Sequence, residues 1–172
     1  MKAWRGQVAI PPGFIAFEYA IGAKWLELLK EISPSVTRAA VLRDPTIAAG
    51  IGQFAAIQAV VPIGIELSAV GLQDAGAIEP AVAAFARGSN GGLVVTASPF
   101  GANYPGAIAG LAARYKLPAV YPFRYFVSAD GLISYGPDTN DQYRPAAGYV
   151  DASSRARSWP TCRPRCSLAP TR

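Results

Sequence analysis

The chemistry open to this chain is limited by the absence of histidine, the commonest general base and metal ligand. Ser98 therefore has no histidine to activate it as a nucleophile, and we expect it to make hydrogen bonds instead. Gly-x-Ser-x-Gly and Walker-type motifs are absent, as is Gly-x-Gly-x-x-Gly after a predicted strand. Cys162 and Cys166 have no second Cys or His pair to complete a zinc site. The sequence predicts no catalytic residue, no metal and no cofactor, and we expect that the protein is not an enzyme.

Aromatic side chains and one arginine are concentrated between Pro118 and Gly136. Phe123 and Arg124 directly follow a predicted strand, and arginine binds carboxylates through two parallel hydrogen bonds. Aromatic walls around a fixed guanidinium would suit a small organic anion. The alternative, which the residues leave equally open, is that Phe123 and Phe126 fill the core and Arg124 forms a structural salt bridge.

Two aspartates also lie close to predicted strand ends. Asp44 precedes Pro45 at the start of a predicted helix, where an N-cap is more common than a general base. Asp138 is expected to cap a later helix. A small flavodoxin-like or isomerase-type enzyme would need an acid/base pair, and only these two carboxylates are available for it.

Short aliphatic runs alternate with amphipathic segments from Ala39 to Val150. We expect helices at 18–32, 48–61, 77–86, 103–116 and 138–149, and strands at 38–42, 65–70, 93–96, 119–121 and 132–135. Asp74 is the expected cap of the third helix, and Gly88–Gly92 an expected tight turn. This alternation predicts an α/β fold, a three-layer arrangement of a parallel sheet with helices on both faces.

Ligands of such folds bind beyond the carboxyl ends of the strands. The residues at these ends fall at 43–46, 97–101, 122–125 and 136–138. The residues that we expect to bind a ligand are Asp44, Thr46, Ser98, Phe100, Tyr121, Arg124 and Tyr135.

The positive charge is concentrated at one end of the chain. The net charge is +5, and residues 151–172 alone hold five arginines against one acidic residue. A basic terminal segment is weaker support for nucleic-acid binding than a basic folded face, so we expect no nucleic-acid partner. No apolar run approaches the roughly 20 residues of a membrane span. Residues 1–7 are too short and polar for a secretion signal, which predicts a cytoplasmic location for the chain as written.

Three stretches of the chain carry a family resemblance. They resemble a bacterial family of ABC-transporter substrate-binding proteins. The first is Lys24–Ile32 together with Arg38–Leu42, the second is Leu111–Arg124, and the third is Gly131–Gly136. The resemblance covers about Gly13 to Asp151. It implies one lobe of a type I periplasmic binding protein, which captures a small solute between two lobes in the periplasm and delivers it to a membrane permease. The solute would be amino-acid-like or another small anion.

The chain also departs from that family. Family members begin with an export signal and a first lobe, which this sequence lacks, so the resemblance implies a truncated single lobe. We expect residues 1–12 to be poorly ordered, 13–151 to form the solute-binding lobe, and 152–172 to be a basic, disordered tail. Because one lobe offers half of the contacts, we expect weak binding or none. The remaining alternatives are a ligand-sensing module of a cytoplasmic regulator, the small enzyme above, and a non-functional truncated product.

The tail allows a prediction about the gene. Family members continue after the equivalent of Asp151 with a peptide like Arg-Ile-Leu-Lys-Gly-Glu-Lys, whereas this chain has Ala-Ser-Ser-Arg-Ala-Arg-Ser. One nucleotide sequence that encodes this chain's peptide also encodes the family-like peptide when it is read in a frame shifted by one nucleotide. We therefore expect residues 152–172 to be out of frame. The nucleotide sequence tests this, and a shifted frame without a family-like peptide would refute it.

Overall fold

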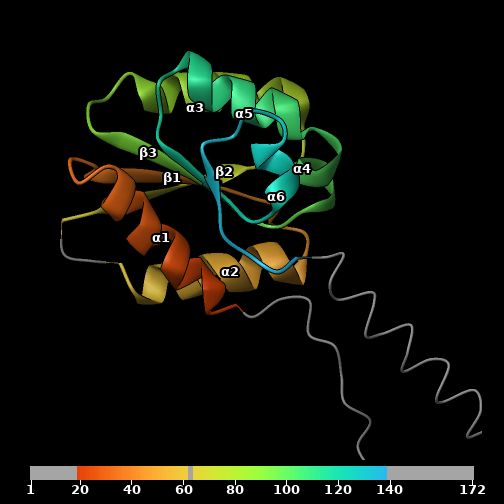
Figure 1. Ribbon diagram of the computed structural model, residues 1–172, viewed down its shortest axis with the longest axis horizontal. Coiled ribbons are helices and arrows are strands. Elements are labelled where there is room, and N and C mark those ends of the chain that lie inside the picture. The colour runs from red at the N-terminus through yellow and green to blue at the C-terminus, as the bar shows by residue number, and fades with distance from the viewer. Residues whose placement is uncertain (1–18, 62–63, 139–172) are drawn as a thin grey trace, which may run out of the picture. The chain divides into compact units, whose positions relative to one another are not determined.

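The computed structural model describes residues 19–61 and 64–138 (Figure 1). The chain divides into two units, Met1–Asp138 and Thr139–Arg172, and all described residues belong to the first. The predictions for residues 1–12, for a helix ending at Tyr149 and for the tail at 152–172 lie outside the described residues. None of the helices in the described part of the chain is long and apolar enough to cross a membrane.

A five-stranded parallel sheet forms the centre of the described unit, with strand order β2-β1-β3-β4-β5. The strands are β1 (Arg38–Arg43), β2 (Glu66–Gly71), β3 (Gly91–Val95), β4 (Ala119–Tyr121) and β5 (Ile133–Ser134). Leu42 is in register with Val70 on one side and Val95 on the other. The carboxyl ends of all five strands therefore lie at one edge of the sheet, and the predicted α/β fold with a parallel sheet is confirmed.

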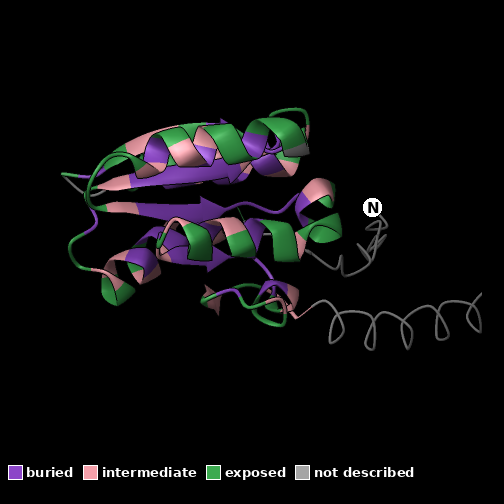
Figure 2. Cartoon of the chain, turned by 90° about the horizontal axis from the view of Figure 1, so that it is seen from above, coloured by how far each residue is buried: buried purple, intermediate pink, exposed green. Residues whose placement is uncertain are grey.

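Helices cover both faces of this sheet (Figure 1). On one face lie α1 (Ile21–Ile32) and α2 (Ala48–Ala59), and on the other α3 (Ala75–Ala86) and α5 (Pro105–Arg114). The short helices α4 (Pro99–Asn103) and α6 (Arg124–Val127) follow β3 and β4. The inner strands are buried between the helical layers, whose exposed residues face outward (Figure 2). This is the predicted three-layer arrangement.

The first helix shows how side-chain spacing builds a layer. Trp25, Leu26 and Leu29 recur at helical spacing and are each at most 1% exposed, because they pack against the sheet. The Trp25 indole Nε1 also donates to the carbonyl oxygen of Tyr135 at 2.6 Å. This bond links α1 to the chain directly after β5 and fixes the outer edge of the sheet.

One predicted detail of the helices was wrong, and one short helix was not predicted. The helix expected at 103–116 is α5, which begins at Pro105, and the unpredicted α4 ends before Tyr104, whose φ and ψ of −128° and 45° are not helical. Asp44 does not cap α2, which begins only after Ile47, since the carboxylate instead accepts hydrogen bonds from Thr46. The predicted cap at Asp74 is confirmed by its hydrogen bond from the Gly76 amide at 2.9 Å.

Two glycines give a matched test of this packing. A Cβ added to Gly50 on α2 would overlap the backbone oxygen of Asp44, whereas one added to Gly110 on α5 meets no atom within 4 Å. We expect Gly50→Ala to lower the free energy of unfolding by about 3 kcal/mol. Gly110→Ala should raise it by about 0.5–1 kcal/mol, because alanine favours the helix. Urea denaturation measures both, and equal effects would contradict the packing of α2 against the β1–α2 loop.

Candidate functional site

The strand order places a topological switch point between β1 and β3. The chain leaves β1 toward β2 on one side and returns to β3 on the other side of β1. In open parallel sheets the crevice at such a point, outside the carboxyl ends of the strands, is the usual ligand site. In this structure the residues that follow β1 and β3 occupy that position, and we use the name carboxyl-edge crevice for residues 44–46 and 96–101.

The first side of the carboxyl-edge crevice is a tight turn formed by Asp44 and Thr46. The Asp44 Oδ1 atom accepts from the Thr46 amide at 2.9 Å and from its hydroxyl at 2.6 Å. These hydrogen bonds, the hydroxyl first, hold the pKa of Asp44 below its usual value, although burial opposes them. Asp44 is only 9% exposed and is therefore a shielded carboxylate that is ionised at neutral pH.

A glutamine on α2 is hydrogen-bonded to the second side of the crevice. The Gln53 Oε1 atom accepts a hydrogen bond at 2.9 Å from the amide of Ala97, the second residue after β3. Gln53 is 0% exposed, and its Nε2 atom has no hydrogen-bond partner among the described residues. A buried donor without an acceptor costs free energy, so this amide is suited to a water or a ligand. Sequence analysis missed Gln53, whose only signal was a polar residue within an apolar helix.

Ser98 and Phe100 form the second side of the crevice. The Ser98 hydroxyl oxygen accepts from the Gly101 amide at 2.9 Å and so caps α4. Ser98 is 8% exposed, and its hydroxyl hydrogen has no acceptor in the described part of the chain. The half-buried Phe100 ring lies 4.8 Å from the ring of Tyr104, which is 50% exposed. This side therefore offers one hydroxyl and an aromatic surface.

Residues after β4 lie farther along the same edge. Phe123 and Phe126 are buried in the core, and Arg124 Nη1 pairs with Asp138 Oδ2 at 3.2 Å. These contacts match the structural alternative that the sequence left open for this segment. The Arg124 side chain is still 81% exposed, so its guanidinium remains accessible to a second anion.

The two tyrosines among the expected ligand-binding residues have different surroundings. Tyr135 is 45% exposed. Its backbone amide donates a hydrogen bond to the Tyr121 carbonyl oxygen, and its carbonyl oxygen accepts one from the Trp25 indole. Tyr121 is 1% exposed, with its ring stacked 4.9 Å from that of Phe126. Its side chain lies in a cavity at the outer edge of the sheet, away from the turn at Asp44.

The structure therefore places the seven expected residues in three groups. Asp44 bonds directly to Thr46, and Ser98 and Phe100 follow the neighbouring strand at the same edge. Arg124 and Tyr135 follow β4 and β5. Within residues 19–61 and 64–138, no three His, Cys, Asp or Glu side chains gather as metal ligands would.

Two solved structures resemble this fold. A conserved domain protein from Vibrio cholerae O1 biovar El Tor gives a TM-score of 0.69 at 21% sequence identity. An ABC domain from Streptococcus pneumoniae in complex with L-Trp gives a TM-score of 0.69 at 16% identity. Each match covers 78% of this chain and 45% of the other chain, so the matched part spans less than half the length of either. No protein-family model and no curated protein matches the sequence.

These likenesses establish the fold of the described unit. It is an α/β unit with a five-stranded parallel sheet, and part of each of the two solved structures has the same fold.

The Asp44 turn should give this lobe a pH-dependent stability. Because the folded state lowers the pKa of Asp44, the stabilisation is present at neutral pH and is lost as the pH falls through the folded-state pKa. We expect Asp44→Ala to cost about 2 kcal/mol at pH 7 and progressively less below about pH 4. Urea denaturation of the unchanged protein and of Asp44→Ala, at pH 7 and below about pH 4, measures this cost. A cost that does not change with pH would show that the carboxylate charge does not stabilise the turn.

Proposed function

We propose that this chain forms one lobe of the solute-binding component of an ABC import system. In this proposal the carboxyl-edge crevice supplies half of the ligand cleft, and a second lobe closes over the solute. Binding proteins of this kind gain affinity by closing two lobes around a ligand. The fold supports the proposal, because its switch point is where open α/β sheets bind small molecules.

The observation that carries the proposal is unused hydrogen-bonding capacity of two buried side chains, Ser98 in the crevice and Gln53, which is hydrogen-bonded to Ala97. The Ser98 hydroxyl hydrogen and the Gln53 Nε2 amide each have no partner among the described residues, although both side chains are at most 8% exposed. Buried polar groups are nearly always hydrogen-bonded in native proteins. A polar solute would supply the missing acceptors.

The charges at this edge favour an amino-acid-like solute. The ionised Asp44 carboxylate would attract an ammonium group, and the exposed Arg124 guanidinium would attract a carboxylate. Phe100 and Tyr104 offer an aromatic surface to an apolar side chain. The structural neighbour from Streptococcus pneumoniae was crystallised with L-Trp, which agrees with this class of ligand.

The partners and location follow from the same proposal. The solute is a small molecule, the recipient is an ABC permease, and the compartment is the periplasm. Nucleic acid is not a partner in this proposal, and no chemical step is assigned to the lobe. The two carboxylates that an enzyme would need bind other groups, since Asp44 accepts from Thr46 and Asp138 pairs with Arg124.

Nuclear magnetic resonance titration of the 172-residue chain with each of the twenty L-amino acids tests the proposal. We expect one or a few of them to shift the amide signals of Asp44, Thr46 and residues 98–101. The affinity should be weak, with a dissociation constant on the order of millimolar, because a single lobe leaves one side of the ligand in water. Shifts confined to the opposite edge of the sheet would contradict the proposed cleft.

Charge-neutralising variants sharpen this experiment. Asp44→Asn keeps an oxygen that can accept from Thr46 but removes the charge, so amino-acid affinity should fall about tenfold. Glu66→Gln makes the same charge change at the opposite edge, where Glu66 is 72% exposed, and should leave affinity unchanged. Equal losses in both variants would indicate a non-specific effect of net charge.

A further inference from the structure

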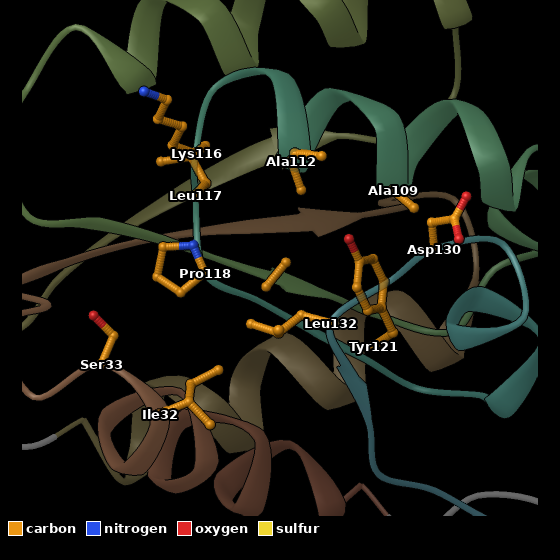
Figure 3. Close-up of a pocket in the computed structure, with 12 residues that line it drawn as sticks. Ile32, Ser33, Ala109, Ala112, Lys116, Leu117, Pro118, Tyr121, Asp130 and Leu132 are labelled. Carbon is orange, nitrogen blue, oxygen red and sulfur yellow. The ribbon is translucent and has the colours of Figure 1, made fainter.

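A cavity of about 400 Å³ opens at the outer edge of the sheet, and we call it the edge pocket. Strand β5 pairs only with Val120 and Tyr121, so among the described residues Ala119 at the start of β4 has no neighbouring strand on this side. The edge pocket lies between Ile32 at the end of α1 and Ala112 on α5 (Figure 3). Its volume is within the range of small-molecule sites, and most of the residues that line it are apolar.

The Tyr121 side chain brings a polar group into this apolar cavity. The residue is 1% exposed, and its hydroxyl points into the edge pocket (Figure 3). No hydrogen bond of this hydroxyl is found among residues 19–61 and 64–138. Burial raises the pKa of Tyr121 to about 12, so the hydroxyl stays protonated at neutral pH and can both donate and accept.

Asp130 and Lys116 add opposite charges to the lining of the edge pocket. Asp130 lies beside Tyr121 at one end, and Lys116 lies toward the other end (Figure 3). Neither side chain forms an ion pair within the described part of the chain. The end at Asp130 therefore combines a carboxylate with a tyrosine hydroxyl, a pair that can bind an ammonium group.

Backbone strain coincides with these two charges. Asp130 and Lys116 have φ values of 66° and 53° and are two of the three described non-glycine residues with positive φ. Each follows a helix, and the hydrogen bonds Gly131 N to Phe126 O and Leu117 N to Ala112 O are those of a helix-ending turn. Glycine is strongly preferred at the positive-φ position of such a turn. Residues in sparsely populated backbone conformations cluster at functional sites.

We propose that the edge pocket is a second binding site, separate from the carboxyl-edge crevice, for a small organic cation with an apolar body. The ammonium group lies at the end formed by Asp130 and the Tyr121 hydroxyl. The apolar body contacts Ala109, Ala112 and Leu132. Lys116, near the other end, repels the ammonium group and so favours this orientation.

Isothermal titration of the 172-residue chain with 2-phenylethylammonium tests the proposal. The probe 3-phenylpropanoate has the same phenylethyl body with an anionic group and is the matched control. We expect saturable binding of the amine and at least tenfold weaker binding of the acid. Equal affinities for the two probes would overturn the proposal. Absence of saturable binding would also overturn it, including the case in which another part of the chain already fills the pocket.

Substitutions locate the binding and separate it from stability. Tyr121→Phe and Asp130→Asn should each weaken amine binding about tenfold, and Glu66→Gln at the opposite edge should not change it. Asp130→Gly should weaken binding similarly yet raise the melting temperature, because glycine accepts the positive φ. Unchanged amine affinity in Asp130→Asn and Asp130→Gly would overturn the proposal. These results do not depend on amino-acid binding at the carboxyl-edge crevice.

Discussion

The parallel pairing of β1 with β3 is the constraint on which the candidate site depends. Residues Ala39–Leu42 and Leu93–Val95 are completely buried on both faces, so their register is fixed by the two helical layers. That register brings the chain after β1 and the chain after β3 to the same edge. Hydrogen bonds from the Thr96 amide and hydroxyl to Leu42 O, at 2.9 and 3.0 Å, extend the pairing beyond the strand. Asp44 and Ser98 therefore flank one crevice without needing direct contact.

The polar groups at this crevice are positioned by helices whose other residues pack in the core. Gln53 belongs to α2, where Ile57 packs against the sheet, and its side-chain oxygen holds the Ala97 amide. Ser98 caps α4, which holds Phe100 beside the crevice. Such positioning by a rigid scaffold is what a binding site requires, since a preorganised site loses less conformational entropy when the solute binds.

The sequence was sufficient for the fold. Aliphatic runs and helical spacing predicted all five strands and their parallel direction, because burial on both faces requires such runs. It did not predict the role of Asp44, because an aspartate before proline can cap a helix or form a turn with Thr46, and residue type does not decide between them. Gln53 and Asp130 were missed for a similar reason. Their importance depends on burial and on backbone φ, which residue type does not reveal.

The two proposed sites use different parts of one sheet, with the crevice at the carboxyl ends of β1 and β3 and the edge pocket beside β4. A crystal structure of this protein, grown with the amino acid that most raises its melting temperature, tests the central claim most directly. We predict solute density in contact with Asp44 and Ser98, with an acceptor atom facing the Ser98 hydroxyl. Density elsewhere, or a crevice sealed by the protein's own chain, would contradict the assignment of this edge as a ligand face.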